Sequence, residues 1–386
     1  MTPELQHKIN SIIYANPQAD DKEVLYQLKQ LIYETDKTTI EEVLPFTEHI
    51  KESFLTIQKR ANRADIFEAT FGFPQLDEIT NGFNFGEFVV VGARPAMGKT
   101  AFLLSLVNHI SQTYPVLYIT LDLSASQLTE RLIVSVVEIR GESIRSGRLE
   151  DDEWERLDKN GKKLFERQLF IQDKSNTSID AIRTLCEQQI KENGVKVIFV
   201  DYIQLISAYR KRQYREQEVS YISRELKNIA KLFNVCVIAS SQLNRGIENR
   251  QGMWGKRPQL SDLRDSGAIE QDADKVLFVH RPEYYGLTED EMGNSLVGVA
   301  EIIVAKNRNG AVGISLLRFD NEYIRFRNLN DRSVVSVAKS HCNFAGKDEF
   351  SFTPNRYMEV SQNKELETSE PLNKLIDELD LEKPPF

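Results

Sequence analysis

The chain has 386 residues, 41% of them hydrophobic and 28% charged, and a formal net charge of −9. This length and balance predict one large domain with appendages, or two domains, with enough apolar residues for a sizeable core. The apolar runs are far shorter than the roughly 20 residues that a membrane span requires, and the N-terminus lacks the pattern of a secretory signal. The three cysteines are isolated from one another, which argues against a disulfide framework and a zinc site. A reducing cytoplasm is therefore expected.

Residues 1–70 are predicted to be helical, with a short N-terminal region at 1–38 and a linker helix with its connector at 39–70. The candidate helices are 3–14, 21–33 and 44–62. The third carries an apolar stripe at spacings of three or four residues, made by Phe46, Ile50, Phe54 and Ile57. Such a stripe packs either on its own domain or on a neighbouring subunit.

From about residue 71 the pattern changes to apolar runs that alternate with helical stretches. The predicted strands are 88–93, 116–120, 169–172, 195–200, 235–240, 276–280 and 300–305, with a closing hairpin at 314–319 and 323–326. The main helices predicted between them are 100–113, 125–139, 179–193 and 217–233. Continuous Val, Ile and Leu strands that alternate with helices indicate an α/β domain over 71–330, with a mostly parallel sheet covered on both faces.

The strongest motif follows the first predicted strand and opens a helix, as a phosphate-binding loop does. It consists of Ala93, Arg94, Pro95, Ala96, Met97, Gly98, Lys99 and Thr100, followed by Ala101. In such a loop, backbone N–H groups and the helix N-terminus face phosphate oxygens. We expect Lys99 to reach the β- and γ-phosphates of ATP, and the Thr100 hydroxyl to bind Mg²⁺.

Three polar side chains follow other predicted strands of the same sheet. Asp201 ends the run 195–200 and is expected to hold Mg²⁺ through water, as a Walker B carboxylate does. Asp122 follows 116–120, where RecA-like motors place the carboxylate near the γ-phosphate; alternatively it caps the next helix, a role that Ser124 could also fill. Gln242 follows 235–240 and either senses the γ-phosphate or lies in a solvated turn.

Charge is distributed unevenly along the chain. Residues 331–386 contain 11 acidic and 7 basic residues, a net of −4, and are predicted to be largely disordered. Residues 209–215 read YRKRQYR, a basic and aromatic cluster. The negative total is therefore a weak argument against a nucleic-acid partner.

Longer stretches resemble the C-terminal motor domain of hexameric replicative DNA helicases of the DnaB type. They are GARPAMGKTAF, LDLSASQLTERL, VDYIQLI, EVSYISRELKNIAKLFNVCVIASSQLNR, KRPQLSDLRDSGAIEQDADKVLFVHR and VAKNRNG, in order over about 71–326. The resemblance implies a RecA-like P-loop ATPase that uses ATP and Mg²⁺, forms a hexameric ring and unwinds forked DNA while single-stranded DNA passes through the ring. A helicase loader or a replication initiator is an implied partner.

The resemblance also implies roles for residues outside the phosphate-binding loop. Lys306 and Arg308 would reach the γ-phosphate on the neighbouring subunit. Arg131 would approach the γ-phosphate side, while Arg281 and Tyr284 would flank the adenine. The implied DNA contacts, which would be independent of base sequence, are Arg264, Asp265 and Gly267 in one loop and Arg210, Lys211 and Arg212 in another.

Two departures from the family pattern leave alternatives open. The family usually has Glu at the position of Asp122, and it carries a larger N-terminal helical domain that recruits primase, whereas about 62 residues precede the motor here. One alternative is a RadA- or KaiC-like ATPase in recombination or signalling. The other is a nucleotide-binding, non-catalytic partner of a helicase.

Overall fold

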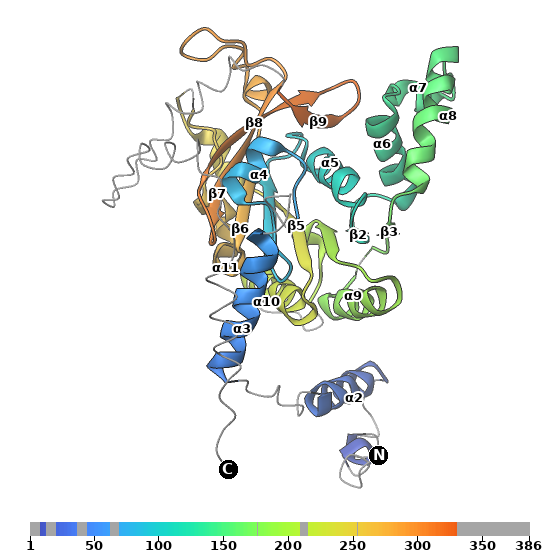
Figure 1. Cartoon of the computed structure of the whole chain (residues 1–386), viewed down its shortest axis with the longest axis vertical. Helices are drawn as coiled ribbons and strands as arrows, with labels where there is room; N and C mark the ends of the chain where they lie inside the picture. The colour runs from blue at the N-terminus through green and yellow to red at the C-terminus, as the bar shows by residue number, and fades with distance from the viewer. Residues whose placement is uncertain are drawn as a thin grey trace. The chain divides into compact units, whose positions relative to one another are not determined.

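The computed structural model describes residues 8–12, 21–36, 45–61, 69–175, 177–208, 215–252 and 254–329. These residues fall into two compact units, one within the first 64 residues and one that begins at Asp65 (Figure 1). The first unit contains α2 (Asp21–Asp36) and α3 (Phe46–Ala61). On α3, Phe46 and Ile57 are exposed. The predicted disorder of 331–386 concerns residues outside the described part.

The second unit is built on a nine-stranded sheet in the order β3-β2-β4-β5-β1-β6-β7-β8-β9. The strands are β1 (Phe88–Ala93), β2 (Val116–Thr120), β3 (Leu169–Gln172), β4 (Val197–Asp201), β5 (Cys236–Gln242), β6 (Lys275–His280), β7 (Val299–Asn307), β8 (Gly313–Asp320) and β9 (Arg325–Asn328). The first six pair in parallel, and β7, β8 and β9 are antiparallel additions at one side. The predicted α/β class is therefore confirmed.

Both faces of the sheet are covered, as the unbroken apolar strands require. All six residues of β1 are buried. Val89 and Val91 pack into a core with α5 (Lys99–Ile110), while Phe88 and Val90 pack into a second core with α9 (Ile179–Asn193) and α10 (Arg215–Phe233). Figure 1 shows these helices around the strands.

The remaining helices include several that the apolar pattern did not predict. The α-helices are α4 (Pro74–Thr80), α6 (Ala125–Val137), α7 (Gly141–Ser146), α8 (Asp151–Phe165) and α11 (Gly267–Asp272). The 3-10 helices are η1 (Ile203–Leu205), η2 (Arg245–Asn249), η3 (Leu260–Ser266) and η4 (Pro282–Tyr285). Only α6 was predicted. No helix in the described part of the chain combines the length and apolarity that crossing a membrane requires.

The direction of β7 places its last residues and the loop after β1 at opposite edges of the sheet. The carboxyl ends of the parallel strands form one edge of the sheet, which we call the carboxyl edge. Because β7 runs antiparallel to β6, Asn307 pairs with Lys275, and Lys275 pairs with Val89 near the start of β1. The end of β7 therefore lies at the opposite edge, which we call the amino edge.

Candidate nucleotide-binding site

The loop after β1 has the backbone that a phosphate-binding loop needs. Gly98 has a φ of 92°, and a Cβ atom there would lie 3.2 Å from the Phe326 ring. The positive φ therefore favours glycine, and a Cβ atom would also require the Phe326 ring to shift by a few tenths of an ångström. Helix α5 begins at Lys99 without an acidic residue in its first turn, so its N-terminal N–H groups are available to an anion. Met97 is buried in the core and contributes only its backbone to the loop.

Lys99, Thr100 and Asp201 converge at the carboxyl edge, as predicted from their strands. Lys99 Nζ lies 3.0 Å from Asp201 Oδ1 and donates to Ser240 Oγ at 3.0 Å. Thr100 Oγ1 donates to Asp201 Oδ2 at 2.9 Å. A hydroxyl and a carboxylate oxygen at one point are donors that Mg²⁺ prefers, so these residues fit that ion.

Asp201 is held as a buried carboxylate. Burial would raise its pKa, but the Lys99 ammonium and hydrogen bonds from Ser240, Lys99 and Thr100 outweigh burial and lower it. Tyr118, fully buried on β2, donates from Oη to Asp201 Oδ2 at 3.2 Å. Sequence reasoning missed Tyr118 because a single tyrosine in an apolar strand carries no sign of its partner.

A cavity of about 460 Å³ opens beside these groups. Its lining includes most of the predicted site residues: Ala93, Arg94, Pro95, Ala96, Gly98, Lys99, Thr100, Ala101, Asp122, Arg131, Asp201, Gln242 and Arg281. Sequence reasoning did not single out the other lining residues, Tyr202, Phe319, Asn321 and Ile324. Three of these four come from β8 and the turn after it, which the chain order places far from the loop.

Asp122 lines the cavity and does not cap the helix that follows it. The N-cap of α6 is Ser124, whose side chain accepts from the Gln127 N–H in a capping box. The Tyr202 ring lies near Asp122, and Lys99 Nζ stands 4.2 Å from the ring centroid. The Asp122 carboxylate is thus available for chemistry in the cavity.

Gln242 also lines the cavity, and its backbone is hydrogen-bonded to Gln204 in η1. Gln204 accepts from the Gln242 N–H at 3.2 Å through Oε1 and donates from Nε2 to the Gln242 carbonyl at 3.2 Å. The Gln242 side chain is exposed. Gln204 is a second residue that sequence reasoning missed, since its partner is 38 positions away.

Arg94 fixes the loop from within. The buried guanidinium donates to the Leu243 carbonyl at 2.8 Å and to Glu248 Oε1. It therefore ties the phosphate-binding loop to the segment after β5.

Arg281 and Tyr284 separate in the structure. The Arg281 guanidinium stacks 4.0 Å from the centroid of the Phe319 ring and donates to Asn321 Oδ1 at 3.2 Å. Tyr284 does not line the cavity: it lies in η4, is 54% exposed and contacts Tyr285 edge to face. Tyr284 lies in the η4 turn that starts at Pro282, so Arg281 lines the cavity and Tyr284 does not, and the pairing of these two residues around the adenine stays a prediction.

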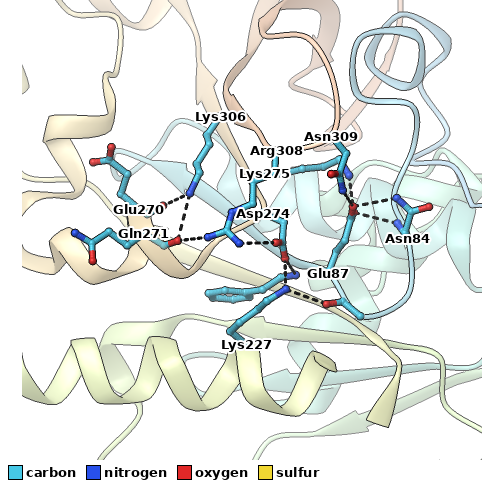
Figure 2. A network of polar contacts seen from close by, with 12 residues as sticks. Asn84, Glu87, Lys227, Glu270, Gln271, Asp274, Lys275, Lys306, Arg308 and Asn309 are labelled. Carbon is cyan, nitrogen blue, oxygen red and sulfur yellow. Dashed lines mark hydrogen bonds and ion pairs between the residues drawn. The ribbon is translucent and has the colours of Figure 1, made fainter. Parts of the chain in front are cut away.

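Among the described residues, those to which the resemblance assigns the trans-acting cations and the DNA contacts do not line the cavity. Lys306 and Arg308 are at the amino edge (Figure 2). The implied DNA segments are η3, which contains Arg264 and Asp265, and Gly267 at the start of α11. The described residues do not include Arg210, Lys211 and Arg212.

Comparison with known proteins places this geometry in a family. Residues 69–328 match the DnaB-like helicase C terminal domain. A replicative DNA helicase of Bacillus subtilis (strain 168) is 38% identical over 318 residues, which cover 79% of this chain and 68% of that protein.

Two solved structures have similar folds. One is an ATPase domain with a TM-score of 0.67 and 35% identity, covering 72% of this chain and 98% of that one. The other, a DnaB-like replicative helicase described with its primase interactions, has a TM-score of 0.68 and 31% identity, covering 84% of this chain and 75% of that one.

Proposed function

The chain belongs to the DnaB-like helicase family of ATP-driven replicative DNA helicases, and from that premise we propose how it works. It assembles as a ring, most simply a hexamer, binds ATP with Mg²⁺ between subunits and moves along single-stranded DNA to separate a forked duplex. The convergence of Lys99, Thr100 and Asp201 at one point beside the loop carries this proposal.

One subunit supplies the binding half of the site. The loop N–H groups and Lys99 would hold the β- and γ-phosphates, and Thr100 and Asp201 would hold Mg²⁺, whose charge would offset that of the phosphates. On ATP binding, Lys99 gives up its pairing with Asp201 and turns to the phosphates. Arg281 and Phe319, which stack on each other and also line the cavity, would contact the nucleoside.

The same subunit orients the attacking water. Asp122 accepts its proton, and Gln242 and Arg131 contact the γ-phosphate side. Gln204 keeps the Gln242 backbone in place. A carboxylate one methylene shorter than the family's usual Glu reaches less far, which makes the hydrolysis rate sensitive to the position of the bound nucleotide.

The other half comes from the next subunit. Lys306 and Arg308 lie at the amino edge, and β1, at about 3.3 Å per residue, separates that edge from the loop by roughly 15 Å or more. These cations therefore serve a neighbour's nucleotide, where they stabilise charge in the transition state. Within one chain the site is incomplete.

The DNA contacts lie in two loops, one through η3 to Gly267 and one through residues 209–214. They bind phosphates, so affinity falls with salt and depends little on base sequence. Helix α3, on which Phe46 and Ile57 are exposed, docks on the adjacent subunit.

The experiment is ATP hydrolysis with and without single-stranded DNA, for the wild type, Lys99→Ala and Asp122→Glu, followed by unwinding of a forked duplex. We expect DNA-stimulated turnover that falls by about 10³-fold in Lys99→Ala, because phosphate charge loses its partner. A DNA-bound ring with ATP turnover but no strand separation at any salt concentration would refute helicase action. Turnover only in Asp122→Glu would indicate a ring that binds ATP without acting as a motor.

The recombination or signalling alternative receives no support from the family match, which runs from residue 69 to 328. The non-catalytic alternative is tested by the same assay, since it requires ATP binding without turnover.

A further inference from the structure

Arg308 is anchored to Asp274 by both its backbone and its side chain. The Arg308 N–H donates to the Asp274 carbonyl at 2.9 Å, and Arg308 Nη1 lies 3.5 Å from Asp274 Oδ1 (Figure 2). The guanidinium itself is about half exposed. The Arg308 guanidinium is therefore exposed at the surface, whereas the residue that anchors it, Asp274, is buried within the fold.

Asp274 is held in turn by groups on β1 and α10. Its buried Oδ2 accepts from the Phe88 N–H at 2.7 Å and from Lys227 Nζ at 2.6 Å, and Lys227 also donates to the Gly86 carbonyl at 3.0 Å. One carboxylate oxygen is thus occupied by β1 and α10, and the other faces Arg308. A carboxylate with such hydrogen-bond partners can keep the Arg308 guanidinium within the narrow range of positions that catalysis needs.

The last carbonyls of α11 hold both cations. Lys306 Nζ donates to the Glu270 carbonyl at 2.5 Å, and Arg308 Nη2 donates to the Gln271 carbonyl at 2.5 Å (Figure 2). Such carbonyls lack partners within a helix and carry its negative dipole end, so they favour cations. Across the turn, Asn309 Nδ2 donates to Glu87 Oε1 at 3.1 Å.

The two helices that make these bonds start at the two segments assigned to DNA. Helix α11 begins at Gly267, directly after η3, and ends at the carbonyls that hold Lys306 and Arg308. Helix α10 begins at Arg215, directly after residues 209–214, and carries Lys227 to Asp274. A shift of either helix is therefore a shift of the groups that hold the cations.

We propose that Asp274, supported by Lys227, is a positioning residue for Arg308, and that α10 and α11 connect DNA contact in one subunit to the cations that this subunit offers its neighbour. The inference rests on the proposed function, since it needs a ring and a site shared between subunits. If Asp274 served only to stabilise the fold, its loss would act within its own subunit.

The first test is Asp274→Asn, which preserves shape and removes charge. We expect kcat with single-stranded DNA to fall by about 10²-fold while the KM for ATP and the affinity for DNA stay unchanged, because the binding half is intact. The stimulation of turnover by DNA should fall toward none. Glu301→Gln is the matched control: its buried carboxylate on β7 binds Arg257 and touches neither cation. It should alter melting temperature without separating kcat from KM.

The decisive test mixes two inactive variants in one ring. An Asp274→Asn subunit retains Lys99, and a Lys99→Ala subunit retains Asp274, so about one interface in four of a random ring carries two intact halves. We expect recovery of about a quarter of wild-type turnover. No recovery would overturn the inference, because a defect confined to its own subunit cannot be complemented.

A parallel mixture of Arg308→Ala with Lys99→Ala distinguishes a failure of the positioning role of Asp274 from a failure of the shared site. If this mixture recovers and the Asp274→Asn mixture does not, the positioning role is wrong and the shared site stands. If neither recovers, the shared site itself is wrong. Should Asp274→Asn fail to form rings, Lys227→Met replaces it, with an expected loss of about 10-fold in kcat at unchanged KM and the same recovery. An unchanged kcat in that variant would also overturn the inference.

Discussion

The two edges of the sheet hold their cations in different ways. At the carboxyl edge, Lys99 is mostly buried and is paired with Asp201, beside a cavity that opens between the loop and β8. At the amino edge, Arg308 is about half exposed and is held by Asp274 and by the Gln271 carbonyl. The first edge is arranged to receive a ligand and the second to present a charge.

Under the proposed function, this difference would explain why one subunit is insufficient. A binding site needs concave surface and groups that can exchange one partner for another, as we propose for Lys99, which would turn from Asp201 to phosphate. A cation that acts on a neighbouring subunit must be held in a fixed position and exposed at the surface. One domain offers both features, at opposite edges of its sheet.

Arg308→Ala gives the largest expected effect at the amino edge. Without the charge in the transition state, kcat should fall by about 10³-fold or more, while ATP binding stays unchanged. Steady-state hydrolysis and a nucleotide titration measure the two quantities. Arg318→Ala, an exposed arginine on β8, is the control and should behave as the wild type. Equal loss of ATP binding in Arg308→Ala would place the residue in its own subunit's site and remove the distinction between the edges.

Asp122→Asn tests the chemistry of the carboxyl edge. Loss of the proton acceptor should reduce kcat by about 10²-fold with little change in KM, and Asp122→Glu should retain activity or increase it. Single-turnover hydrolysis separates this step from product release. Wild-type turnover in Asp122→Asn would assign the base to another residue.

The strand β6 runs from the amino edge to the carboxyl edge of the sheet, and its histidine gives a test of how stability depends on pH. Its first residue, Lys275, is buried in an ion pair with Glu87, whereas burial and the nearby Arg257 lower the pKa of His280 at its end to about 3. Because this pKa lies below the ordinary value, the unfolded chain binds the proton first as pH falls. Stability should therefore decline below about pH 6.5, by about 2 kcal/mol at pH 5.

Denaturation of wild type and His280→Phe at pH 7 and pH 5 measures this contribution. The variant should lose less stability between the two pH values. Asp77, whose pKa burial raises to about 6, contributes in the opposite direction but is common to both proteins, so it cancels in the difference. Equal losses would show that His280 takes up its proton without unfolding.

Gln204→Ala gives the smallest expected effect. The variant frees the Gln242 backbone from η1 without removing a group that contacts nucleotide, so kcat should fall by about 10-fold at unchanged KM. Steady-state hydrolysis measures both, and Gln188→Ala on the exposed face of α9 is the control. A rise in KM alone would indicate a role in binding.

Much of the fold was predictable because its strands are continuous apolar runs. The predicted strands 88–93, 116–120 and 169–172 coincide with β1, β2 and β3. The last predicted strand, 323–326, is displaced by two residues: β9 starts at Arg325, since residues 321–324 form the turn. Helix α8 was missed because its sequence is mostly charged, although its acidic first turn and basic last turn are helix signals.

The site divides in the same way. The loop, Asp122, Asp201 and Gln242 were predictable because each directly follows an apolar strand of a parallel sheet. Tyr118, Gln204 and Asp274 were not, because each acts through a partner that only the fold brings near. The position of Tyr284 outside the cavity lining could not be predicted, because the η4 turn that starts at Pro282 depends on packing rather than on spacing.

The reversal of the chain at β7 has a consequence for symmetry. In the shared site proposed above, the amino edge of one subunit would complete the nucleotide site at the carboxyl edge of another. Head-to-tail contacts around a ring would meet this need at every interface, and would give every subunit one neighbour that it serves and another that serves it. A closed assembly of this kind has a sense of rotation built into its covalent topology, before any nucleotide or nucleic acid is bound.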